Sequence, residues 1–78
     1  MARNGWTYWA TYKDDGRAAT PRGPKSFIES TASFISSPQT GVGREVCIMK
    51  ERGGSGAEQT GVCYVGGTRV KQRRRKAP

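Results

Sequence analysis

The sequence has no histidine and few apolar residues: 33% of its 78 residues are hydrophobic, and only 2 are cysteine. Without histidine, the usual base of nucleophilic catalysis and the Cys/His zinc finger are both excluded. No run of about 18 apolar residues is present, which excludes a transmembrane helix. The aromatic segment 6–12 is too polar for the core of a secretory signal, so we expect a cytoplasmic protein.

Common catalytic motifs are also missing. The six carboxylates include one adjacent pair, Asp14-Asp15, and a turn at the end of a strand explains it. The segment Gly53-Gly54-Ser55-Gly56 lacks the Lys-Ser/Thr ending of a phosphate-binding loop and does not open a helix. We therefore expect a non-enzymatic protein without a cofactor or a metal ion.

Positive charge is concentrated near the end of the chain. Lys and Arg number 14 against 6 Asp and Glu, for a net charge of +8. Residues 69–76 hold six cations and no acid, which leaves 8 − 6 = +2 for residues 1–68. Such a run stays solvated and attracts polyanions or acidic protein surfaces, or it merely keeps the protein in solution. We expect a single domain over residues 1–72 and a flexible basic tail over residues 73–78.

Local patterns predict one helix and four strands. Alternating aromatic and β-branched residues predict a strand over residues 6–12. Ser26 and Glu29 have the spacing of a capping box, which predicts a helix over residues 26–37. Its apolar stripe would contain Phe27, Ile28, Ala32, Phe34 and Ile35. Three more strands are expected at residues 45–50, 61–65 and 68–72. The fold class is α+β: a small, mostly antiparallel sheet in the order β-α-β-β-β, packed on one face by a single helix.

Two turns indicate the register of the last three strands. A loop centred on Ser55 places Cys47 opposite Cys63, and the Gly66-Gly67 turn places Tyr64 opposite Arg69. One face then carries Cys47, Met49, Cys63, Val65 and Val70, and the other carries Val46, Ile48, Lys50, Val62, Tyr64, Arg69, Lys71 and Arg73. We expect the helix to cover the cysteine face, because the other choice would press cations against its apolar stripe.

The opposed cysteines are compatible with a disulfide, but a reducing compartment favours two free thiols. Two thiolates without histidine disfavour a zinc site.

The face left open is expected to bind the partner. Tyr64 would stand there among cations, with the exposed Trp9 as a second aromatic platform, whereas Trp6, Tyr8 and Tyr12 are expected in the core. Aromatic side chains beside basic groups are typical of single-stranded nucleic-acid sites, although ordinary strand packing also explains Tyr64. The predicted partner-binding residues are Trp9, Lys50, Tyr64, Arg69, Lys71, Arg73, Arg74 and Arg75.

In its size and in the β-α-β-β order of segments 6–12, 26–37, 45–50 and 61–72, the chain resembles the small anti-CRISPR proteins encoded by phages and other mobile elements. This resemblance implies a non-enzymatic inhibitor that binds a CRISPR surveillance complex of a bacterial host and blocks target-DNA recognition. Many members of that class are acidic mimics of DNA, and this basic chain departs from that pattern. The residues alone also support a free DNA- or RNA-binding protein. Either would act as a monomer or a homodimer.

Overall fold

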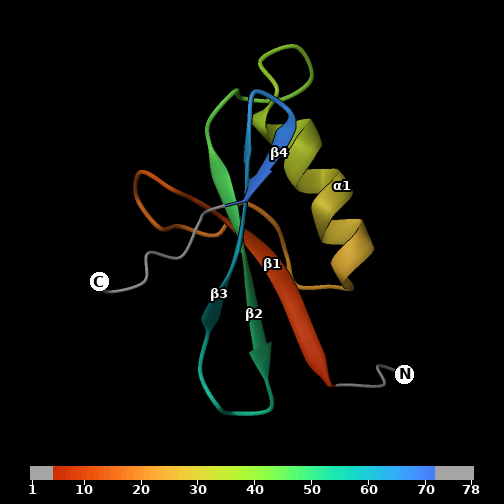
Figure 1. The fold of residues 1–78 in the computed structure, drawn as a ribbon, viewed down its shortest axis with the longest axis vertical. Coiled ribbons are helices and arrows are strands. Elements are labelled where there is room, and N and C mark those ends of the chain that lie inside the picture. Colours follow the sequence, from red (N-terminus) through yellow and green to blue (C-terminus); the bar gives the residue numbers. More distant parts are fainter. Residues whose placement is uncertain (1–4, 72–78) are drawn as a thin grey trace.

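The computed structural model describes residues 5–71, in which one helix packs on a four-stranded antiparallel sheet (Figure 1). The elements in chain order are β1 (Trp6–Tyr12), α1 (Lys25–Ser36), β2 (Val46–Arg52), β3 (Glu58–Val65) and β4 (Thr68–Lys71). Strands adjacent in sequence are adjacent in the sheet, in the order β1-β2-β3-β4. The α+β class expected from the sequence is confirmed. Within the described residues, no helix has the length and apolarity that a membrane crossing requires.

The helix α1 begins earlier than the sequence suggested. Its N-cap is Pro24, and no side chain caps the first turn by a hydrogen bond, so the capping box predicted at Ser26 and Glu29 is wrong. Proline suits a helix start because it lacks the amide hydrogen that would have no partner there.

Pairing between the strands follows the predicted register at the start of β2 and across the Gly66-Gly67 turn, but it is shifted by two residues beside the glycine-rich loop, where Lys50 lies opposite Glu58. Cys47 lies opposite Cys63, and Tyr64 lies opposite Arg69. Up to Lys71, the two sets of face-sharing residues expected from the sequence follow from these pairings, and Arg73 lies outside the described residues.

A bulge in β3 was not expected. Gln59 of β3 pairs with Met49 of β2, and Cys63 pairs with Cys47. Between these two pairs β3 spans four residue steps, whereas β2 spans only two. The Thr60 hydroxyl enters the interrupted ladder and donates to the Ile48 carbonyl oxygen at 3.0 Å. Because the insertion is an even number of residues, side chains beyond it keep their faces.

The face that α1 covers is the opposite of the one we expected. The buried cluster beneath the helix consists of Ala10, Ile28, Ala32, Val46, Ile48, Val62 and Tyr64. The helix lies mainly over β1 and β2. Arg69 and Lys71, on the edge strand β4, therefore remain exposed beside α1. We had argued against this face because covering it would bury Arg69 and Lys71, but the helix leaves both side chains exposed.

An inner stripe of one isoleucine and two small side chains, and not the phenylalanines, brings α1 onto the sheet. Ile28, Ala32 and Ser36 recur every four residues and are each 0% exposed. Phe27 and Phe34 are 54% and 58% exposed, so their predicted place in the core is wrong. The Phe side chains lie outside the stripe that recurs every four residues, on the solvent side of the helix.

Two serines of α1 also hold the turn between β3 and β4. The Ser33 hydroxyl donates to the Gly67 carbonyl oxygen at 2.8 Å, and the Gly67 amide donates to the Ser36 hydroxyl at 3.0 Å. A side chain on Gly67 would meet the Ser37 Cβ at 3.2 Å, and the backbone there has a φ of +87°, so glycine is required at this contact.

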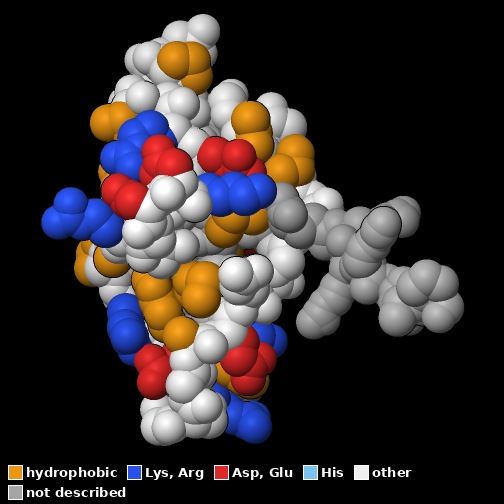
Figure 2. All heavy atoms as spheres, turned by 90° about the vertical axis from the view of Figure 1, so that its left-hand side faces the viewer, with side chains coloured by type: hydrophobic (Ala, Val, Ile, Leu, Met, Phe, Trp, Pro, Cys, Tyr) orange, Lys and Arg blue, Asp and Glu red, His pale blue; other side chains and the backbone are white. Residues whose placement is uncertain are grey.

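The face away from α1 is partly covered by the chain that follows β1. Residues 17–23 run along the outer edge of this strand, where the Gly23 amide donates to the Tyr8 carbonyl oxygen at 2.8 Å. The Arg22 guanidinium carbon lies 4.1 Å from the centroid of the Trp9 ring, and Trp9 is only 7% exposed. Trp9 is therefore not the open platform that we expected. Figure 2 shows this face, where apolar side chains lie between neighbouring groups of positive and negative charge.

Candidate functional site

A pocket of about 250 Å³ opens between the first turns of α1 and the sheet. We call it the basic pocket. Its lining residues are Tyr8 of β1, Lys25 and Glu29 of α1, Ile48 and Lys50 of β2, Thr60 and Val62 of β3, and Arg69 and Lys71 of β4. All four strands contribute side chains from the helix-facing side, because alternate residues of a strand share a face. Four cations and a single carboxylate thus line one hollow.

None of these four cations forms an ion pair within residues 5–71. That range holds nine of the 14 cations and all six acids, and three of the nine bond to carboxylates. The ion-paired cations are Lys13, Arg22 and Arg44. Four of the remaining six line the basic pocket, whose field is therefore less compensated than that of the rest of the described surface.

Aromatic side chains extend the basic pocket toward the end of the sheet. Tyr8 lies opposite Lys50, and Trp6 lies opposite Arg52, on the same face. The Lys50 ammonium is 4.4 Å from the Trp6 ring centroid, and the Arg52 guanidinium carbon is 4.9 Å from it. Tyr8 and Trp6 are half-buried. Tyr8 packs against the core, as expected, and also lines the basic pocket. Trp6 was expected in the core but does not belong to the core cluster; its ring contacts Lys50 and Arg52 instead.

Tyr64, the aromatic residue predicted for this surface, lies inside the core and is 5% exposed. Burial raises the pKa of Tyr64 above its usual value, and the negative charge of Glu29 raises it further, while Arg69 acts in the opposite direction. A ring enclosed in this way cannot stack on a ligand. Its function is to fill the space between α1 and β3.

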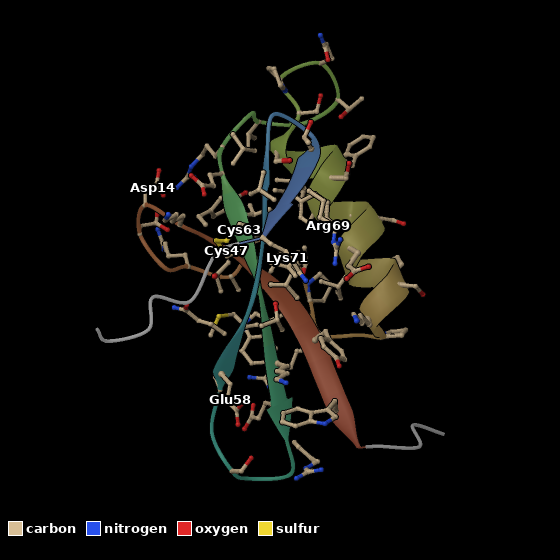
Figure 3. All side chains as sticks on the ribbon, in the orientation of Figure 1. Asp14, Cys47, Glu58, Cys63, Arg69 and Lys71 are labelled. Carbon is tan, nitrogen blue, oxygen red and sulfur yellow. A yellow bond between two sulfur atoms is a disulfide. The ribbon has the colours of Figure 1, made fainter. Side chains whose placement is uncertain are left out.

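Three of the eight predicted partner-binding residues are brought together. Lys50, Arg69 and Lys71 all line the basic pocket, and Figure 3 shows Arg69 and Lys71 on the side of the sheet that faces α1. Tyr64 and Trp9 are buried, which contradicts their predicted exposure. Arg73, Arg74 and Arg75, with the tail over residues 73–78, lie outside the described residues.

Sequence reasoning missed Lys25 and Tyr8 in this site. Lys25 sits at the first helical position, and Tyr8 faces Lys50 across β1 and β2. Neither followed from the predicted faces, because the pairing of β1 with β2 and the placement of the helix start over the sheet are tertiary features.

The cysteines form a disulfide on the opposite face, between β2 and β3 (Figure 3). Their Cα atoms are 3.9 Å apart. The expectation of two free thiols is contradicted, because it rested on the compartment, whereas the register places the two side chains in direct contact.

Comparison with known protein families, with curated proteins and with solved structures found no match. Any function must therefore be argued from the site itself.

Proposed function

We propose that this chain is a non-enzymatic nucleic-acid-binding protein whose basic pocket receives backbone phosphates. The observation that carries this proposal is the convergence of Lys25, Lys50, Arg69 and Lys71 on one pocket, without ion pairs to the described acids. Ammonium and guanidinium groups bind phosphate directly, and the release of counterions from the nucleic acid favours association. The single carboxylate, Glu29, offsets only part of the charge.

The neighbouring aromatic rings favour a single strand over a duplex. Tyr8 lines the basic pocket, and unpaired bases can stack on a ring beside a bound phosphate. The sequence continues after β4 with Arg73, Arg74, Arg75 and Lys76, which lie outside the described residues and add positive charge.

Oligonucleotide titration tests this function. The variant Lys50→Gln/Arg69→Gln/Lys71→Gln removes three cations of the pocket. The matched control Lys13→Gln/Arg22→Gln/Arg44→Gln removes three cations that are ion-paired elsewhere. Labelled single- and double-stranded oligonucleotides would be titrated at several salt concentrations. If each pocket cation binds one phosphate, the pocket variant should lower the slope of log K against log salt by roughly 0.7 per cation lost.

The control should retain most of the slope of the parent protein. If both variants lost the same amount of slope, net charge alone would explain binding, and the pocket would be refuted as the binding site. Absence of binding by the parent protein at about 50 mM salt would refute nucleic-acid binding altogether.

A second candidate, inhibition of a host nucleoprotein complex, is favoured by a separate observation. Phe27 and Phe34 lie seven residues apart on the outer side of α1 and are both more than half exposed. Exposed aromatic side chains at this spacing are typical of helical protein-binding surfaces. A CRISPR surveillance complex is the partner implied by the resemblance in size and element order.

To test this candidate, the protein would be mixed with purified CRISPR surveillance complexes. Its capture by a complex and the loss of target-DNA binding by that complex would be measured. Phe27→Ala/Phe34→Ala should abolish inhibition and leave oligonucleotide binding unchanged, whereas the pocket variant should do the reverse. A panel of complexes that keep full DNA binding would contradict inhibition.

A further inference from the structure

A carboxylate lies beside the two cysteines on the face away from α1. Glu45 precedes Cys47 by two residues, and β2 places Cys47 opposite Cys63. A carboxylate oxygen of Glu45 and both sulfur atoms all lie within 4.8 Å of one another. We propose that, once the disulfide is reduced, Glu45, Cys47 and Cys63 bind a divalent metal ion of borderline softness, such as Zn²⁺.

The donor atoms fit the chemistry of this ion. Zinc binds thiolates at about 2.3 Å and carboxylate oxygens at about 2.0–2.2 Å, so the donors of a tetrahedral site lie roughly 3.5–3.8 Å apart. The three donor atoms already lie within 4.8 Å of one another, so this arrangement requires only small displacements once the sulfur atoms separate. The paired strands hold the two cysteine backbones in place while this happens.

A fourth ligand can enter from solvent. A hollow of about 170 Å³ is lined by both cysteines, by Gln59 of β3 and by Lys13 of the turn after β1, among other residues. Cys47 is half-buried, so an ion can reach its sulfur from this hollow. Three protein ligands and one water molecule form the common open arrangement of zinc.

The metal must compete with Lys13 for Glu45. In the disulfide form, the Lys13 ammonium lies 3.6 Å from a carboxylate oxygen of Glu45, with 52% and 33% of the two side chains exposed. An ion pair with this exposure contributes little to stability, so the metal displaces Lys13 at small cost.

Reduction controls the site because the disulfide occupies both sulfur atoms. A dithiol supplies two electrons and two protons, the S–S bond breaks, and the dithiol itself becomes a disulfide. Metal binding then turns the two thiols into thiolates and releases their two protons to solvent. Metal affinity therefore depends on the redox state of Cys47 and Cys63, and it falls at low pH.

Cobalt provides a direct readout, since thiolate ligation to Co²⁺ produces an absorption band that oxygen ligands do not. The full chain would be titrated with Co²⁺ in the disulfide form and after reduction by dithiothreitol, with the reductant removed without air. We expect one Co²⁺ per reduced chain, with the thiolate band, and no such band in the disulfide form. Added Zn²⁺ should displace the cobalt.

Variants separate the three ligands. Cys47→Ser should abolish the thiolate band or reduce it strongly. Glu45→Gln keeps both cysteines and should weaken Co²⁺ binding at least about tenfold, because even outer partners of ligands contribute that much. Glu58→Gln, an exposed carboxylate near the far end of β3, is the control and should bind like the parent protein. Circular dichroism would verify that each variant is folded.

Three results would overturn the proposal. These are equal binding by the oxidised and reduced forms, a Glu45→Gln affinity equal to that of the parent, or one metal shared between two chains. The outcome is independent of nucleic-acid binding, which depends on the opposite face.

Discussion

Tyr64 illustrates how the position of one side chain changes its role. Its ring fills the core beneath α1, while its hydroxyl lies in the electrostatic field of Glu29 and Arg69. Burial and the charge of Glu29 raise its pKa above the ordinary 10.0. The same residue on an open face would have been a stacking platform, with a pKa closer to that of free tyrosine.

The raised pKa of Tyr64 predicts a loss of stability in alkali. Above pH 10.0 the unfolded chain loses the phenol proton while the folded chain still holds it, so the free energy of unfolding falls as pH rises toward the folded-state pKa. Tyr64→Phe has no such proton and should lose less stability between about pH 9 and about pH 11. Urea unfolding at both pH values, with neutral pH as the reference, measures the difference. Parallel falls in the two proteins would contradict the prediction.

At the scale of the element, α1 combines a narrow inner stripe with an apolar outer side. Its inner stripe of Ile28, Ala32 and Ser36 allows close approach to the sheet, and the hydroxyls of Ser33 and Ser36 hold the turn at Gly67. Its phenylalanines remain outside. The helix therefore does two things: it closes the core, and it forms one wall of the basic pocket.

Two truncations in α1 should differ sharply in cost. Ile28→Ala removes a side chain that is 0% exposed and should cost about 2–5 kcal/mol. Phe34→Ala removes a larger side chain that is 58% exposed and should cost less than about 1 kcal/mol. Urea unfolding of both variants under the same conditions gives the comparison. A loss for Phe34→Ala as large as for Ile28→Ala would place the phenylalanine in the core after all.

At the scale of the whole molecule, the two faces of the sheet carry different chemistry. One face carries the helix and the basic pocket, whose four cations form no ion pair with the described acids. The other carries the disulfide, the covered Trp9 ring and the ion pairs of Lys13 and Arg22. The disulfide links β2 to β3 across a sequence separation of 16 residues, which include the glycine-rich loop.

Reduction of this disulfide should lower the stability of the whole domain. Closing a loop of about 15 residues stabilises a fold by roughly 3 kcal/mol through the entropy of the unfolded chain. Thermal unfolding with and without reductant measures the loss. The double variant Cys47→Ser/Cys63→Ser should resemble the reduced protein and should not respond to reductant. A double variant as stable as the disulfide form would show that the crosslink contributes nothing.

Local signals were enough to predict the elements and most of the register. The alternation of segment 6–12 reproduces β1, and the Gly66-Gly67 turn correctly places Tyr64 opposite Arg69. These local signals did not reveal the bulge at Thr60 and Gly61. The Thr60 hydroxyl there donates a hydrogen bond to the Ile48 carbonyl oxygen, a contact between two strands that no local pattern records. Of the candidate site, Lys50, Arg69 and Lys71 were predicted to lie together, and the basic pocket contains all three.

Local sequence patterns were sufficient for the set of elements, for most of the pairing of the last strands and for the residues that share each face. These depend on period, turn residues and neighbours in the chain. Only the tertiary structure decided which face α1 would cover, and with it the fate of Tyr64, Trp9 and the two phenylalanines. The physical reason is lateral position: a helix lying over β1 and β2 leaves the cations of the edge strand in water, and no local pattern records where a helix lies across a sheet.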